Sequence, residues 1–599
     1  MTTSAVFGAR RRLHKLAGHW PAALFLAAYA LLACAYSWFV PLGETPDEIG
    51  HFQFVRYVAD RGRLPVQELR PGNEVGEGHQ APLFYILGGL ATAGIDAADV
   101  ATLRNNPDMS FAVDQVGNKH VHIHTLAETW PPTGYALAWR VARLLSIGAG
   151  LLAGALAYLF ALTAFRGSRP EATFALAFLA LNPQWVFISA GIGTDSLAAA
   201  AGGALLLTTA GLLVRPRATP WQAVWLGLAV GVALLTKLTL GVLIGICFGA
   251  VALRLRGNIA LLARRTMVAG GTALAVAGWW LARNLWLYGD PFALNVDRAQ
   301  NPSLVGAGKV DIQLLRSLLL TVRDSYFARF GWMNIAPPLW VYDVVTVVLS
   351  VAAAGIALWL ALRLTGRTAV TVSASLLGLS LASVLGFLIA LLVFAIGKGP
   401  SGYQGRYLFP VAAAVSVCLA TGLLQWVPAR RRWWAVGALG AVGIGVCVYS
   451  LWQIVVPAYP SPLPIYPPSR AVTPELPLDA RYDRGITLLA GAAVPSMLIL
   501  LGLELSRFAW SRQVPVLVAS IGLRLLVGPL VGSGLASAFQ LEGAARQAGV
   551  TQTAMPTAVI TTVLASEYNL EPQLITAIVF FSTILSPLTL TPLLFFLRG

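Results

Sequence analysis

The sequence is poor in charged residues and in cysteine. Only 11% of its 599 residues are Asp, Glu, Lys or Arg, it has four cysteines, and 57% of it is hydrophobic. So few charges exclude an ordinary water-soluble chain of this length, and cysteines that all lie in apolar runs exclude a disulfide framework and a cysteine zinc site. Apolar runs of at least ~18 residues recur along the chain, each long enough to cross a bilayer. The sequence therefore predicts an all-α polytopic membrane protein.

Acidic residues are the scarcer of the two charged classes, with 26 Asp and Glu against 42 Lys and Arg. The basic residues cluster in short loops between alternate apolar runs, for example 10–15, 254–265 and 430–432. If these loops are cytoplasmic, the chain has about 16 spans, a cytoplasmic N-terminus and an outer loop over residues 41–140. The basic charge thus indicates orientation in the cytoplasmic membrane, with lipids and not nucleic acid as partners.

One dense polar cluster follows the first apolar run, at Asp47, Glu48 and His51. Thr45 and Glu48 have the spacing of a capping box, so Glu48 could serve only to start a helix. Asp47 and His51 are four residues apart and would share a helix face. An acid beside a histidine outside the membrane suits a general base, and the three side chains could instead bind a divalent metal.

Other polar side chains of the same loop could form a second wall of this site. His79, Gln80 and Tyr85 lead into a short apolar helix expected at 81–90, where Tyr85 could alternatively be an interfacial anchor. His120, His122 and His124 alternate and could meet a metal along an extended strand. No acid or cysteine accompanies them at a familiar spacing, so no metal or other cofactor is firmly predicted.

Residues 1–455 resemble the GT-C superfamily of membrane glycosyltransferases, in the branch with outer PDExxH and HQxPLYY motifs. The matching residues are Asp47, Glu48, His51, His79, Gln80, Pro82, Leu83 and Tyr85, followed along the chain by Asp195, Lys237, Arg283, Asn284, Arg329, Gln404 and Arg406. The resemblance implies a helical bundle with an outer loop domain. It also implies an inverting hexosyl or pentosyl transfer from a polyprenyl-phosphate sugar to a lipid- or glycan-linked acceptor, with Asp47 as base and the later residues binding substrate.

Three arginines and one lysine are expected to bind the lipid phosphate. Arg283, Arg329 and Arg406 fall at outer ends of the expected spans, where a leaving phosphate needs fixed positive charge. Snorkelling to lipid headgroups is the alternative for each of them. Lys237 would be costly facing lipid, so it either contacts the phosphate or snorkels.

The last part of the chain has a different character. Residues 456–484 are rich in proline and predict a semi-rigid linker. Ala493-Val494-Pro495, the run from Gln552 to Ala558 and the run from Ser582 to Ser586 follow in this order. With these motifs, residues 485–599 are similar to the second half of auxin efflux carrier (AEC) transporters, which implies about four to five helices forming one inverted repeat, and transport of small organic anions. Pro556 with Gln552 would be the helix break of the substrate site, and Arg524, near mid-span, a further costly charge. Because only one repeat is visible, the tail is expected either to pair in a homodimer or to be an inactive relic of gene fusion.

Overall fold

The computed structural model describes residues 18–67, 75–106, 109–113, 119–124, 126–215, 219–300, 312–366, 368–398, 404–459, 513–539, 541, 543–557, 561, 565 and 571–597. Two compact units divide the chain, Met1–Pro468 and Ser469–Gly599. The boundary between them falls within the linker expected at 456–484. The predictions that concern residues 460–512, including most of that linker and the first motifs of the carrier-like tail, lie outside the described residues.

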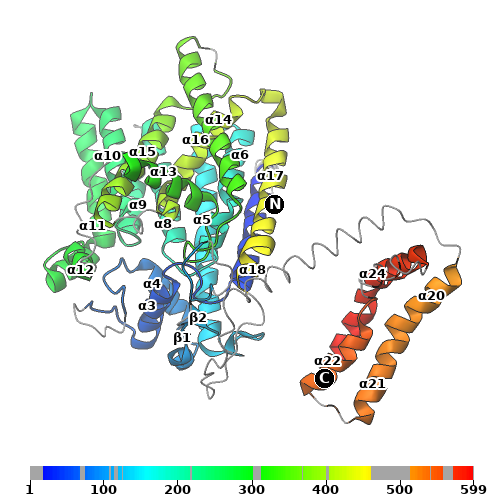
Figure 1. The fold of residues 1–599 in the computed structure, drawn as a ribbon. Coiled ribbons are helices and arrows are strands. Elements are labelled where there is room, and N and C mark those ends of the chain that lie inside the picture. The colour runs from blue at the N-terminus through cyan, green and yellow to red at the C-terminus, as the bar shows by residue number, and fades with distance from the viewer. Residues whose placement is uncertain are drawn as a thin grey trace, which may run out of the picture. The chain divides into compact units, whose positions relative to one another are not determined.

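The first unit is built from long apolar helices (Figure 1). Those of spanning length are α2 (Trp20–Phe39), α5 (Gly134–Ala164), α8 (Asp195–Val214), α11 (Ile259–Tyr288), α14 (Leu339–Leu364), α15 (Ala374–Lys398), η5 with α16 (Gly405–Val411 and Ala412–Leu424) and the run from η6 to α18 (Ala429–Arg431, Arg432–Tyr449, Ser450–Val455 and Val456–Ala458). A bent pair, α6 (Arg169–Ala180) and α7 (Pro183–Ser189), turns by 60°. The prediction of an all-α polytopic membrane protein is confirmed.

The number of spans differs from the expectation of about 16. The described residues contain ten helices that are long and apolar enough to cross a membrane, or 11 with the bent pair. Two expected spans, α9 (Trp221–Leu234) and α10 (Leu240–Leu255), have only 14 and 16 residues. At 1.5 Å per residue these two helices are shorter than the hydrocarbon layer of about 30 Å.

Small residues allow the helices of this bundle to pack closely. Helix α5 packs against α6 and α8, and α9 packs against α11. At Gly202 of α8, an added Cβ would lie 1.8 Å from the carbonyl oxygen of Pro410 in η5, so only glycine fits there. Such close backbone approach is typical of helix packing in membranes. It seats η5, which carries Arg406, directly against α8.

A polar subdomain, residues 41–133, lies at one end of the bundle (Figure 1). Its described elements are α3 (Glu48–Arg61), α4 (Leu83–Thr92), η1 (Ala98–Thr102), β1 (Arg104–Asn105), β2 (His122–Ile123) and η2 (Leu126–Glu128). The two strands are antiparallel, with Asn105 opposite His122. Aromatic side chains form its core, where Phe54 stacks on Tyr85 at 3.8 Å between ring centroids and Phe52 on Trp139 at 4.2 Å. The short helix expected at 81–90 is α4.

The remaining described helices of the first unit are α12 (Leu294–Gln300) and α13 (Ile312–Phe327). In the second unit the described helices are α20 (Val514–Gly522), η8 (Leu523–Val527), α21 (Gly528–Ala538), α22 (Gly543–Ala554) and α24 (Pro572–Leu597). Helix α22 ends two residues before Pro556, where the sequence predicts a break, because proline cannot donate the next helical hydrogen bond.

Candidate active site

The polar cluster begins with an unusual backbone conformation. Asp47 is the residue before α3 and has a φ of 63°, in the left-handed region, and its side chain makes no capping hydrogen bond. The helix begins at Glu48, not at Pro46 as a capping box requires. One half of the expected capping box forms, since the Thr45 amide donates to Glu48 Oε2 at 3.4 Å. The other half does not, because Thr45 Oγ1 is buried without a hydrogen-bond partner among the described residues. Asp47 is turned out of the helix, and its carboxylate is free to face a different partner from that of Glu48.

Glu48 is committed to a buried ion pair. Its two carboxylate oxygens accept hydrogen bonds from Arg143 of α5, from Nε at 2.6 Å and from Nη2 at 2.8 Å, and both side chains are fully buried. Glu48 also accepts from the Trp139 indole at 2.9 Å and from the Ile192 amide at 2.9 Å. Its Oε2 also accepts from the amides of Gly43 at 3.0 Å and Thr45 at 3.4 Å. These contacts indicate a structural role for Glu48.

Asp47 belongs to a chain of alternating charges. Arg406 donates to its carboxylate at 2.5 Å and lies 3.7 Å from Asp195, which in turn bonds Lys237 at 2.6 Å. Arg406 is almost buried, whereas the Asp47 side chain is 40% exposed. The charges of the two acids and the two cations cancel, so this group of four side chains is neutral. The carboxylate of Asp47 is its accessible one.

Three separate elements bring these charges together. Asp195 is the first residue of α8, and Lys237 lies in the turn between α9 and α10. Arg406 lies in η5, where a Cβ on the preceding Gly405 would lie 2.2 Å from the backbone nitrogen of Tyr326. Gln404 accepts from Arg406 Nε at 2.7 Å and so helps to orient the guanidinium.

His51 lies beside Asp47 but bonds a different acid. Its Nδ1 is 2.9 Å from Glu77 and 2.9 Å from the hydroxyl of Tyr85. Gln80 joins the group, donating to Glu77 at 2.9 Å and accepting from Tyr85 at 2.7 Å. The expectation that Tyr85 is an interfacial anchor is wrong, because its ring and hydroxyl are buried in this network.

The charges around these groups shift their proton affinities. Burial alone would raise the pKa of Asp47, but Arg406 and then His51 outweigh it and lower that pKa below its usual value. Burial would lower the pKa of His51, yet Glu77 and Asp47 raise it. Burial opposes ionisation of Glu48, and Arg143 overcomes it to lower that pKa as well. Both carboxylates are thus ionised at neutral pH.

A cavity of about 500 Å³ adjoins the charge chain. Its polar lining includes Asp47, His51, Glu77, His79, Gln80, Asp195, Lys237 and Arg406. Its apolar lining includes Leu234, Leu238, Trp280, Phe387, Leu391 and Phe394. A cavity lined by both charged and apolar side chains fits an amphiphilic ligand with an anionic or sugar headgroup.

Several expected site residues lie elsewhere. Arg283 donates to the carbonyl of Pro65 at 2.7 Å, and Asn284 to the carbonyl of Pro291 at 3.2 Å. Arg329 donates to the carbonyl of Met333 at 3.1 Å. Of the three arginines expected to bind the lipid phosphate, Arg406 is the one that contacts Asp47. These other side chains support loop backbone.

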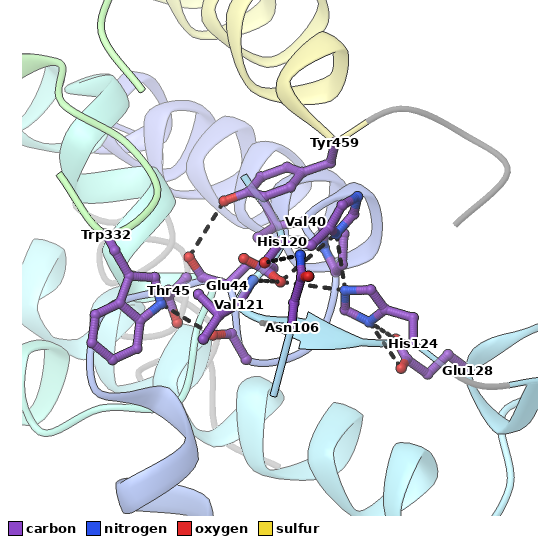
Figure 2. Close-up of polar contacts among 12 residues, drawn as sticks. Val40, Glu44, Thr45, Asn106, His120, Val121, His124, Glu128, Trp332 and Tyr459 are labelled. Carbon is purple, nitrogen blue, oxygen red and sulfur yellow. Dashed lines mark hydrogen bonds and ion pairs between the residues drawn. The ribbon is translucent and has the colours of Figure 1, made fainter. Parts of the chain in front are cut away.

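The metal site considered for Asp47, Glu48 and His51 does not form, because the three side chains turn to Arg406, Arg143 and Glu77 respectively. The three alternating histidines have no acid at a familiar ligand spacing in the sequence, but folding brings one to them. Figure 2 shows that Glu44, far away in the sequence, reaches His120 and His124.

Sequence reasoning missed Arg143 and Glu44 in this region. Arg143 was visible as an arginine inside an apolar run. Glu44 had no comparable signal, because its histidine partners follow about 80 positions later in the chain.

The expected crossover of the second unit is described in part. Arg524 donates from Nε to the carbonyl of Met555 at 2.9 Å, next to the break at Pro556. Arg524 and Gln552 are both exposed in the structure.

Comparisons with known proteins concern both parts of the chain. A family model described as "Membrane transport protein" matches residues 469–594. An uncharacterized transporter of Methanothermobacter thermautotrophicus is 37% identical over 102 residues, and the auxin efflux carrier component 3a of Oryza sativa subsp. japonica is 30% identical over 118 residues. These matches cover 17% and 19% of this chain, and 34% and 19% of the two relatives. The similarity of the tail to auxin efflux carriers is confirmed, and the chain spans about a third or less of the length of these relatives.

Two solved structures are also similar to the chain. ArnT from Cupriavidus metallidurans bound to undecaprenyl phosphate has a TM-score of 0.42 and 14% identity, covering 95% of this chain and 76% of that one. The apo state of the same protein has a TM-score of 0.41 and 12% identity, covering 96% and 78%.

Proposed function

We propose that the first unit transfers a hexosyl or pentosyl group from a polyprenyl-phosphate donor to a hydroxyl of a lipid- or glycan-linked acceptor. The observation that carries this proposal is the placement of Asp47, Arg406 and Lys237 on one cavity of about 500 Å³ with an apolar wall. A polyprenyl chain needs the apolar wall, its phosphate needs the cations, and the acceptor needs a base.

Asp47 has the properties of the base. Its lowered pKa keeps it ionised, its side chain is 40% exposed, and Arg406 bonds one of its two oxygens, Oδ2. The carboxylate takes the proton of the acceptor hydroxyl, whose oxygen forms a bond to the anomeric carbon. The bond from that carbon to the phosphate oxygen breaks, and the lipid phosphate leaves with the electron pair. Attack opposite to the leaving group inverts the anomeric configuration.

The two cations act on the leaving group. Arg406 offers planar, permanently charged donors, and Lys237 offers a compact ammonium group. Both stabilise the negative charge that develops on the phosphate oxygen. Asp195, between them, holds both cations in place. His79, which lines the same cavity and lies 3.7 Å from Asp297, is positioned to contact the sugar or the acceptor.

The proposed function also implies where in the cell the protein acts. We expect the protein in the cytoplasmic membrane with the cavity at its outer face. The support is the set of basic loops at 254–265 and 430–432, which the alternation of the spans assigns to the side opposite the polar subdomain.

Replacing Asp47 with asparagine tests the proposal. Asparagine keeps the size and can still bond Arg406, but it cannot accept the proton, so transfer from a polyprenyl-phosphate sugar in proteoliposomes should fall by about 10²–10⁴-fold. Asp96→Asn is the matched control, because Asp96 is an exposed acid that caps the amide of Ala98. Undiminished transfer by Asp47→Asn would remove Asp47 as the base.

The family match of residues 469–594 supports a second function, transport of small organic anions by the second unit. A single repeat would need a second copy of the chain to complete the site, so this function requires a homodimer. Uptake by proteoliposomes should then fall in Arg524→Gln and be unchanged in Asp47→Asn. No uptake by the wild-type chain would identify the tail as inactive.

A further inference from the structure

A second cluster of ligating side chains lies outside the cavity. Glu44, from the loop before α3, reaches His120 and His124, which flank strand β2 (Figure 2). His124 Nε2 lies 3.0 Å from His120 Nδ1 and 3.3 Å from Glu44 Oε1, and His120 Nδ1 lies 3.7 Å from Glu44 Oε1. All three side chains are buried, with exposures of 0% for Glu44, 3% for His120 and 1% for His124.

These three distances match the edges of a metal coordination shell. Ligand atoms 2.0–2.1 Å from a tetrahedral zinc ion are about 3.3–3.4 Å apart. The three distances in the cluster lie on either side of that value, so one ion at the centre needs only shifts of a few tenths of an ångström. Two imidazole nitrogens and a carboxylate oxygen are also a ligand set that suits zinc and exclude the all-oxygen shells of magnesium and calcium.

An outer partner orients one of the histidines. Glu128 lies 3.0 Å from His124 Nδ1, so it accepts a hydrogen bond from that nitrogen and leaves the Nε2 lone pair directed at the centre of the cluster. A carboxylate that accepts from the far nitrogen of a ligating histidine is a common feature of zinc sites. Val121 donates its amide to Glu44 Oε1 at 2.8 Å, and Asn106 donates to the carbonyl of His120 at 2.9 Å. The ligands are therefore held in place by their surroundings.

Two buried atoms of the cluster have no hydrogen-bond partner among the described residues, Glu44 Oε2 and His120 Nε2. A carboxylate oxygen in such a place is costly unless paired. Bidentate binding by Glu44 would use this oxygen as the fourth ligand. The hydrogen bonds alone give no account of it.

We propose that Glu44, His120 and His124 bind one divalent transition-metal ion of the zinc class, with Glu128 as the outer partner of His124. Because the site is closed to water, the ion has a structural role. It ties the loop that ends at Asp47, three residues after Glu44, to the segment around β2. It would thereby hold the backbone on which the proposed base is mounted, without contacting the substrate.

The neighbouring His122 provides a matched control. It lies between the two proposed ligands in the sequence, but its ring is directed at Gly43, where an added Cβ would lie 2.4 Å from Cδ2. It is buried like the others and is not part of the ligand group. Replacing His122 also removes a buried histidine from this segment, but it removes no proposed metal ligand.

Metal content of the full-length, tag-free protein in detergent tests the proposal. After loading with Zn²⁺ and gel filtration in metal-free buffer, the wild type should retain one zinc per chain by mass spectrometry, as should His122→Asn. His124→Asn and Glu44→Gln should retain none. Glu128→Gln keeps all three ligands and should weaken zinc binding by about 10–100-fold.

If a variant fails to fold, the wild-type protein alone can test for the metal site. Loaded with Co²⁺ in place of zinc, it should show the intense visible absorption of a low-coordinate nitrogen and oxygen site, and zinc should bleach that absorption. Absence of retained metal in the wild type would overturn the proposal. Equal metal loss in His122→Asn and His124→Asn would overturn it as well.

Discussion

Replacing Arg143 with methionine would remove the cation that neutralises Glu48 inside the protein. Arg143 makes two bonds to Glu48 and donates to the carbonyls of Ser37 at 2.7 Å, Val40 at 2.8 Å and Pro41 at 2.8 Å. Both charged side chains are 0% exposed, so no water replaces the lost donors. The arginine therefore joins the end of α2 to the start of α3.

The magnitude follows from these contacts. A buried carboxylate that loses its partner costs about 3–5 kcal/mol, and each carbonyl left without a donor adds about 1 kcal/mol. Glu48→Leu should cost about 3–5 kcal/mol too, because it leaves the guanidinium uncompensated. The double variant, Arg143→Met with Glu48→Leu, leaves neither buried charge without its partner. It should therefore be more stable than the sum of the single effects predicts, by at least about 2 kcal/mol.

Unfolding by SDS in mixed micelles measures the free energies of unfolding for this double-mutant cycle. Glu48→Gln is the control, since it keeps one acceptor oxygen for Arg143. Single effects that add to within about 0.5 kcal/mol would refute the buried pair. A Glu48→Leu variant with normal stability and no sugar transfer would refute the structural role of Glu48 and would indicate a catalytic one.

Three further results are expected. Arg406→Met should reduce the rate of sugar transfer about 10²–10³-fold. The reduction caused by Arg283→Met should be smaller by at least about tenfold. Equal reductions in the two variants would contradict the assignment of Arg406 alone to the site. The pKa of His51 in the folded protein is raised above 6.5, so its contribution to stability is complete below pH 6.5 and is lost as pH rises through the folded value. The midpoint temperature of unfolding should fall over that pH range, and the fall should be smaller in His51→Gln. The same dependence of the midpoint on pH in the variant and the wild type would argue against His51 as the titrating group. Gly202→Ala should destabilise the first unit by about 1–3 kcal/mol, because the new methyl meets the carbonyl of Pro410, and a neutral effect on the unfolding free energy would disprove that contact.

Much of the candidate site could be predicted from the sequence. The order of the motifs indicated that Asp47, His79 and Arg406 would meet, and all three line one cavity. The apolar runs indicated the helices because their length and composition are local properties of the chain.

Partner choice could not be predicted in the same way. Glu48 and Arg143 are 95 residues apart, and their pairing depends on how α3 and α5 pack. Arg283 and Arg329 look like Arg406 in the sequence, but Arg283 bonds the carbonyl of Pro65, 218 positions away, and Arg329 bonds the carbonyl of Met333 in its own loop. The partners of a charged side chain thus follow from tertiary packing, which the local pattern does not contain.

The ion pair between Asp47 and Arg406 also has a consequence for synthesis. Its two residues are 359 positions apart, so at about 5–20 residues per second the ribosome makes Arg406 roughly 20–70 s after Asp47. The pair between Glu48 and Arg143, 95 positions apart, can close after only about 5–20 s. The nascent chain therefore anchors the loop early and leaves Asp47 without its cation until η5 enters the membrane. Any product truncated before residue 406 would contain an anchored but unpaired acid.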